Sequence, residues 1–203
     1  MTGVVVLPGL DGTGSLLAGF CTAVEARGVP ASVVGYPPDR PLGYDGLEEI
    51  VRGRLPNTPF VLLGESFSGP LAIRIAADPP PGLVGLVLST TFARSPIGHV
   101  STIAPLLRFA PARPPMVLLS WLLLGPWATP RLRAQLRDAL ACVDPAVLRA
   151  RAAETLRVDS SGKLGHCGSR AATGRGQRPP AGASCVLAAF CWIATQPHGP
   201  AAR

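Results

Sequence analysis

Ser66 is the residue whose neighbours best suit it to act as a nucleophile. It lies in the segment Phe60-Val-Leu-Leu-Gly64-Glu65-Ser66-Phe67-Ser68-Gly69-Pro70, where an apolar, strand-like run meets a helix-like one. A serine hydroxyl is a weak nucleophile unless it is held exposed, near a base and near donors that stabilise an oxyanion. A sharp strand-to-helix turn would hold Ser66 in this way, and the small residues Gly64 and Ser68 would leave room for the turn. The backbone N–H of Phe67 would then point at a developing oxyanion.

This segment resembles the nucleophile elbow of the α/β-hydrolase superfamily, in which G-x-S-x-G follows a strand and precedes a helix. Ser68 stands where the second glycine is usual, and Gly69 follows one place later. A second segment, Val6-Leu-Pro-Gly-Leu10-Asp-Gly-Thr-Gly14, comes where the family has its oxyanion loop. The resemblance extends over about residues 2–157. It implies that Leu10 supplies the second oxyanion-hole N–H, opposite Phe67, and that Ser66 attacks an ester or thioester carbonyl.

Other readings of the glycine-rich and cysteine-containing segments fit less well. The loop after the first strand could be a plain turn, but it is no P-loop, because the chain has a single lysine, Lys163. Its glycine spacing also differs from the dinucleotide-binding pattern. Ser160-Ser-Gly-Lys163 matches S-x-x-K, but no K-T-G element accompanies it. The cysteines and histidines lack zinc-ligand spacing, so we expect no metal and no cofactor.

The elements that would position Ser66 alternate between strand and helix in the first ninety residues. Apolar, β-branched runs predict strands at 4–7, 32–34, 60–63 and 83–88, and amphipathic stretches predict helices at 15–27, 44–55 and 70–77. The first helix has an apolar face made of Leu16, Leu17, Phe20, Cys21 and Val24, and Asp45 is the candidate N-cap of the second. Such alternation predicts an α/β fold with a mostly parallel sheet covered on both faces. Residues 1–92 form this core.

Residues 93–158 change to a helical pattern. Thr129-Pro130 and Asp144-Pro145 each place an N-cap before a proline at the first helical position. An all-helical insertion after a strand could be a lid over the site, or helices that pack on the sheet edge, and the sequence supports the two equally.

The remaining members of a serine triad have no predicted strand to position them. In the family the order is Ser, then Asp or Glu, then His, and Asp159 with His198 satisfies it formally. Asp159 follows a helical pattern, however, and His198 lies in a Pro/Gly-rich end. We therefore expect this chain to be inactive or nearly so. A truncated, non-catalytic hydrolase-like protein and an acyltransferase that uses the same elbow remain alternatives.

Residues 159–203 depart from the rest of the chain in composition. Acidic residues stop at Asp159, and no late strands appear where the family order requires them. Arginine outnumbers lysine 18 to 1, as in a GC-rich gene, so we hypothesise a coding-frame shift near Leu164; a divergent natural tail is the alternative. Reading the downstream nucleotides in the other two frames tests this: if neither yields an apolar strand followed by Asp and later His, the hypothesis is wrong.

Charge and hydropathy limit the remaining function classes. The net charge of +7 consists of +2 up to Asp159 and +5 after it, so the predicted core has no basic face for nucleic acid. No apolar run has the 18–20 residues, roughly, that span a bilayer, and neither a signal peptide nor a disulfide framework is recognisable. We expect a cytoplasmic protein with a small apolar acyl substrate, and nothing selects an oligomeric state.

Overall fold

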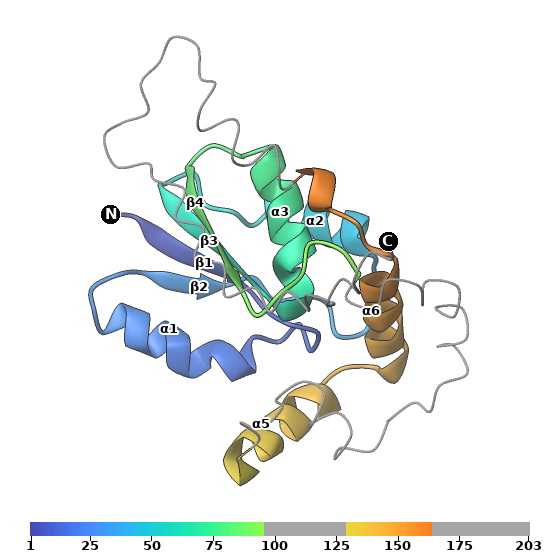
Figure 1. The fold of residues 1–203 in the computed structure, drawn as a ribbon. Helices are drawn as coiled ribbons and strands as arrows, with labels where there is room; N and C mark the ends of the chain where they lie inside the picture. The colour runs from blue at the N-terminus through green and yellow to red at the C-terminus, as the bar shows by residue number, and fades with distance from the viewer. Residues whose placement is uncertain (96–128, 164–203) are drawn as a thin grey trace, which may run out of the picture.

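The computed structural model describes residues 1–95 and 129–163. In this part of the chain, four parallel strands form one sheet in the order β2-β1-β3-β4 (Figure 1). The strands are β1 (Gly3–Leu7), β2 (Ala31–Val33), β3 (Phe60–Glu65) and β4 (Leu83–Ser89). The helices are α1 (Ala18–Glu25), α2 (Tyr44–Arg52), α3 (Gly69–Ala77), α5 (Pro130–Ala141) and α6 (Pro145–Arg157). The α/β fold class predicted from the alternating pattern is confirmed.

The two faces of the sheet differ in how deeply they are buried. Figure 1 shows α1 on one side of the sheet and α2 and α3 on the other. Alternate side chains of β1, β3 and β4 point toward α2 and α3 and form the main core, which includes Val5, Leu62 and Leu86. On the opposite face Val6 and Leu63 are also buried, whereas Val61 and Val87 are only half-buried. The nucleophile candidate therefore follows β3, a central strand that contributes Phe60 and Leu62 to this core.

The first helix differs from its sequence prediction. Residues Ser15–Leu17 form a 3₁₀ turn, and α1 begins only at Ala18. No residue of α1 is buried, and Phe20 on the predicted apolar face is 40% exposed. The periodicity located the helix correctly, but among the described residues nothing packs closely enough on α1 to bury one of its side chains. Gly28, which follows this helix, has the φ of +78° typical of a glycine after a helix end.

The second helix has a different N-cap from the predicted one. Gly43, not Asp45, is the N-cap of α2. The Asp45 carboxylate pairs instead with Arg74 of α3, which also bonds Glu48. The predicted caps of the later helices are confirmed, because Thr129 accepts from Leu132 N–H and Asp144 from Ala146 N–H. A capping residue followed by proline was the more specific pattern.

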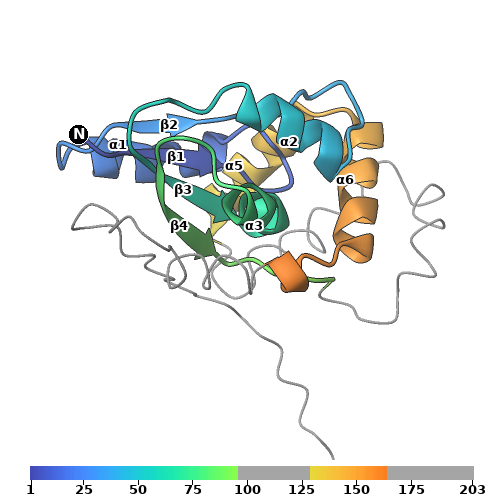
Figure 2. The ribbon, with the colours of Figure 1, turned by 90° about the horizontal axis from the view of Figure 1, so that it is seen from above.

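The helices α5 and α6 pack around the segment that follows β1. Figure 2, which shows the molecule from above, places α6 beyond the carboxyl ends of the strands. The segment after α6 turns back, and Arg94 and Asp159 form an isolated antiparallel bridge. Residues 96–128 of the predicted lid and 164–203 of the predicted tail lie outside the described residues. No helix in the described ranges is long and apolar enough to cross a bilayer.

Candidate active site

Ser66 lies at a sharp turn between β3 and the helix that follows. Its φ is +50°, a left-handed value that is rare for residues other than glycine, and the side chain is half-buried rather than enclosed. Residues Ser66–Ser68 form a 3₁₀ turn, and α3 continues from Gly69. Strained backbone of this kind persists only where its surroundings enforce it. The turn thus presents the Ser66 hydroxyl at the carboxyl end of the sheet.

Close packing behind the turn enforces this strain. A Cβ at Gly64 would lie 2.7 Å from the Ala72 Cβ and 2.9 Å from the Ser68 carbonyl oxygen, so only glycine fits there. The Thr91 hydroxyl, after β4, donates to the Ser66 carbonyl. A Cβ at Gly69 would collide with the Thr91 side chain. The positions on both sides of Ser66 therefore leave the chain no space to relax.

Phe67 anchors the turn to the core. Its side chain is 1% exposed and stacks on the Tyr44 ring, with 4.9 Å between the ring centroids. The Tyr36 ring meets it edge-on at 6.3 Å. The Tyr44 hydroxyl donates to the Phe67 carbonyl at 2.9 Å. Because the Phe67 N–H lies in the first turn, where backbone amides have no intrahelical acceptor, it is available to another acceptor.

The loop that contains Leu10 lies beside this turn. Leu7, the last residue of β1, is paired in register with Gly64 of β3, so the segments that follow these strands leave the same edge of the sheet together. All five carbonyls from Pro8 to Gly12 accept a hydrogen bond. Their donors are, in order, the Ser68 hydroxyl, the Gly12 N–H, the Arg151 guanidinium twice, and the Tyr36 N–H. In contrast, the N–H groups of Leu10 and Asp11 have no acceptor among residues 1–95 and 129–163.

Two carboxylic acids bind the backbone of this loop, one from the elbow and one from the loop itself. The Glu65 carboxyl accepts from the Gly9 N–H, and burial together with the nearby Asp11 charge raises the pKa of Glu65 to about 7. A Cβ at Gly9 would collide with this carboxyl. Asp11 is 5% exposed, and its carboxylate accepts from the N–H and hydroxyl of Thr13. Both acids hold the backbone of the loop.

Ser68 ties the loop to the elbow. It is fully buried, and its hydroxyl donates to the Pro8 carbonyl. The same hydroxyl oxygen contacts the Tyr36 hydroxyl. Since a serine has one proton to donate, the Tyr36 hydroxyl must be the donor of the second bond. Burial raises the pKa of Tyr36, which keeps its proton in place. The serine that replaces the usual glycine thus has a structural function.

The acid and histidine expected from the family order are not brought together by the described structure. Asp159 is exposed, and its carboxylate accepts from the Ser161 N–H at 3.0 Å and from the Ser161 hydroxyl. These bonds lower the pKa of Asp159. Within the described residues no hydrogen bond or ion pair joins Asp159 to Ser66. His198, like His99 and His166, lies outside those residues.

Sequence reasoning missed the residues that hold the loop: Asp11, Tyr36, Glu65 and Arg151. Glu65 lies inside the motif, and its carboxyl group next to a candidate nucleophile was the available signal. Nothing in the sequence marks Arg151, because it is one of three arginines in a helix of ordinary composition.

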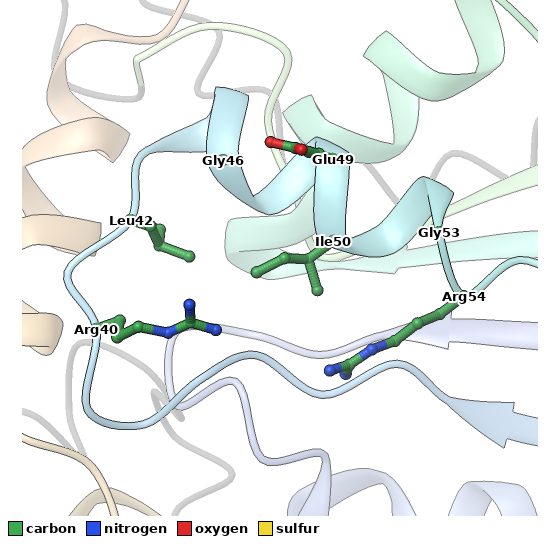
Figure 3. Close-up of a pocket in the computed structure, with 7 residues that line it drawn as sticks. All are labelled: Arg40, Leu42, Gly46, Glu49, Ile50, Gly53 and Arg54. Atoms are coloured by element: carbon green, nitrogen blue, oxygen red, sulfur yellow. The ribbon is translucent and has the colours of Figure 1, made fainter.

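The hollows in the described surface include one beside the loop and one beside α2. One, of about 300 Å³, lies between Thr13 and Ser15 at the end of the loop and the residues Asp138 and Cys142 near the end of α5. The other, of about 480 Å³, lies beside α2, and Figure 3 shows Arg40 and Arg54 reaching into it. None of the residues that line the α2 hollow belongs to the elbow or to the loop after β1. The described residues hold no group of three or more His, Cys, Asp or Glu side chains suited to a metal ion.

Comparison by sequence finds no matching family model and no matching curated protein. Comparison by structure finds similar folds. The enol-lactonase from Burkholderia xenovorans is 19% identical, with a TM-score of 0.61, over 82% of this chain and 70% of that one. MenH from S. aureus is 15% identical, with a TM-score of 0.59, over 83% and 70%. A structure reported with carboxylesterases of the thaumarchaeon Nitrososphaera gargenis is 12% identical, with a TM-score of 0.56, over 82% and 69%. These proteins share one architecture, and the chain therefore has the α/β-hydrolase fold.

Proposed function

We propose that this chain is a serine hydrolase in which Ser66 transfers the acyl group of an ester or thioester. The observation that carries the proposal is the strained turn at Ser66, φ +50°, placed beside a loop whose Leu10 and Asp11 amides have no acceptor in the described part of the chain. The names of two structural neighbours, an enol-lactonase and carboxylesterases, denote hydrolysis of ester-type bonds. This agrees with the chemistry that an exposed serine and a pair of backbone donors can perform.

The proposed reaction begins when the Ser66 hydroxyl oxygen attacks the acyl carbonyl. The hydroxyl proton passes to a general base, and the carbonyl oxygen becomes an oxyanion that the N–H groups of Leu10 and Phe67 stabilise. When this intermediate collapses, the base returns its proton to the leaving group, which departs as the alcohol or thiol and leaves an acyl group on Ser66. Water then releases the acid. Transfer to an alcohol instead of water would use the same residues, which makes an acyltransferase the alternative enzyme.

The base is the part of the proposal that the described residues do not contain. The sequence leads us to expect a chain that is inactive or nearly so; if it has a working base, we propose His198 for this function, with Asp159 to orient it, because they follow Ser66 in the family order. The Ser161 bonds of Asp159 must then be exchanged for one to the histidine. A chain that lacks a working base would retain only the catalysis that the oxyanion donors supply, which is several orders of magnitude slower.

Fluorophosphonate labelling tests the nucleophile. We expect the folded chain to be labelled, and Ser66→Ala to abolish the label. Ser32→Ala is the matched control, because Ser32 is exposed on the edge strand β2 and should leave labelling unchanged. If the folded wild-type chain takes no label, or Ser66→Ala still does, the serine mechanism is wrong and the non-catalytic alternative stands.

The base is tested in the same assay. His198→Gln and Asp159→Asn should each slow the labelling of Ser66 by at least tenfold, whereas His99→Gln and His166→Gln should not. If one of the latter two variants is the slow one, that histidine is the base instead of His198.

A further inference from the structure

The guanidinium of Arg151 is buried without a carboxylate partner. Arg151 is 1% exposed, and within the described ranges no carboxylate oxygen lies at ion-pair distance from it. Removing a charge from water is costly unless hydrogen bonds compensate for the lost hydration, and burial lowers the pKa of Arg151 accordingly. A buried cation of this kind requires an explanation in terms of what it binds.

Arg151 binds the backbone of the loop after β1. Its Nη1 donates to the carbonyls of Leu10 and Asp11, at 2.9 and 2.8 Å, and its Nη2 donates to the Pro37 carbonyl at 3.0 Å. The guanidinium also lies over the Tyr36 ring, 5.5 Å from its centroid. A residue of α6 thereby holds a loop that precedes it by 140 positions.

Because Arg151 fixes two carbonyls of the loop, it also fixes the direction of the N–H groups in the same peptides. In a trans peptide the C=O and the following N–H point in opposite directions. Because Arg151 holds the Leu10 carbonyl, the Asp11 N–H is directed away from α6. Arg151 also holds the Asp11 carbonyl, which fixes the next N–H, that of Gly12. The Gly12 N–H donates to the Gly9 carbonyl at 3.0 Å. The Gly9 carbonyl and the Leu10 N–H belong to one peptide, so the Leu10 N–H is directed away from Gly12.

Gly12 leaves space for the Arg151 guanidinium. Its φ is +70°, and a Cβ there would lie 2.5 Å from Arg151 Nη1. A side chain at this position would therefore displace the guanidinium. On the opposite side of the loop, the Glu65 carboxyl takes the Gly9 N–H, which removes that amide from the set available to a substrate.

We propose that Arg151 is a positioning residue for the oxyanion hole, which holds the carbonyls of Leu10 and Asp11 so that the N–H groups of both residues stay directed at the substrate. This rests on the proposed function of Ser66. It also gives α6 a function in the reaction step. Arg151 acts through the loop and does not touch the reacting atoms.

Two measurements on the full chain test the proposal. One is the rate of fluorophosphonate labelling at Ser66, since phosphonylation also develops charge on an oxygen in the oxyanion hole. The other is amide hydrogen exchange of the peptide that spans residues 8–14, which reports the Gly12 N–H bond directly. The variants are Arg151→Met, which keeps the apolar stem, and Arg151→Lys. Arg149→Met, on the same helix, is the control for loss of one charge, because within the described residues no hydrogen bond joins Arg149 to the loop.

Arg151→Met should label at least tenfold more slowly per folded molecule, as counted by circular dichroism, and exchange within residues 8–14 should accelerate. Arg149→Met should change neither. Arg151→Lys should label at an intermediate rate, because one ammonium nitrogen cannot span the three carbonyls, and it keeps the test valid if the methionine variant does not fold. Wild-type labelling rates in both Arg151 variants, or unchanged exchange in residues 8–14, would overturn the proposal. If the wild-type chain itself takes no label, the proposed function fails, while the exchange measurement still decides whether Arg151 holds the loop.

Discussion

The elbow around Ser66 and the loop around Leu10 leave the same edge of the sheet, but they are held in different ways. The elbow is fixed by close packing of small residues: Gly64 against Ala72, and Gly69 against Thr91. The loop is also closely packed, but its glycines Gly9 and Gly12 lie against the charged side chains of Glu65 and Arg151, and polar groups bind its backbone carbonyls and amides. The elbow therefore depends on small side chains, whereas the loop depends on particular charges and hydroxyls. The following predictions test this difference.

Removing the Phe67 ring should have the largest effect on the elbow. Phe67→Ala empties a site that is packed between Tyr44 and Tyr36, and truncation of a buried aromatic residue costs about 3–5 kcal/mol. Phe20→Ala on α1 is the control and should cost less than about 1 kcal/mol, because Phe20 is 40% exposed. Urea unfolding followed by circular dichroism measures both. Equal losses would show that the elbow does not depend on this anchor.

The pH dependence of the free energy of unfolding should report the protonation of Glu65, whose carboxyl binds the loop. The pKa of Glu65 is raised from its ordinary 4.5 to about 7, so the folded chain favours the neutral carboxyl. Folded Glu65 keeps a proton that the unfolded chain has lost between these pH values, and stability contributed by this group therefore falls as the pH rises from 4.5 to 7. A shift of this size corresponds to about 3 kcal/mol.

Glu65→Gln should remove this fall, since an amide does not titrate. The free energy of unfolding is measured at pH 4.5 and 7.5 for wild type, Glu65→Gln, and the exposed Glu49→Gln as a control for one lost carboxylate. If wild type and Glu65→Gln lose the same stability over this interval, Glu65 is ionised in the folded chain and the account of the loop is wrong.

An added methyl group should disrupt the elbow more than an open position elsewhere. The Cβ of Gly64→Ala would meet Ala72 Cβ and the Ser68 carbonyl below 3 Å, and overpacking of this kind costs about 1–3 kcal/mol. Gly19→Ala is the matched control, because a Cβ at Gly19 meets nothing within 4 Å, and alanine in a helix should stabilise by about 0.5–1 kcal/mol. Opposite signs in urea unfolding are the expected outcome. A neutral Gly64→Ala would mean that the turn can relax.

The difference between the elbow and the loop also explains which features could be predicted from the sequence. The alternation of strands and helices, the position of the strand-to-helix turn and the two caps at Thr129 and Asp144 depend on neighbours within a few residues, and local patterns record such neighbours. The predicted N-cap of α2 was wrong because the helix begins at Tyr44, which places Asp45 inside the first turn, where it pairs with Arg74 of another helix. The exposure of α1 depends on what else covers that face, which periodicity does not report.

The supports of the loop could not be read from spacing, because most of them come from three segments outside it. Arg151 follows its partners by about 140 positions, and Ser68 follows Pro8 by 60. A glycine-rich sequence after a strand predicts that a loop can approach a substrate closely. It does not predict which distant side chains turn its amides outward.

Ser68 joins the two regions, and its removal should have a smaller effect that depends on Tyr36. Ser68→Ala leaves the buried Pro8 carbonyl and Tyr36 hydroxyl without their shared partner, which should cost about 1–2 kcal/mol. In a Tyr36→Phe background the hydroxyl is already gone, so the same change should cost less, with a coupling of about 1 kcal/mol between the two positions. Urea unfolding of wild type, the two single variants and the double variant gives this coupling, with Ser32→Ala as the control for a serine on the surface. Additive losses would mean that the Tyr36 hydroxyl does not donate to Ser68, and the bond from Ser68 to the Pro8 carbonyl would then join the elbow and the loop without it.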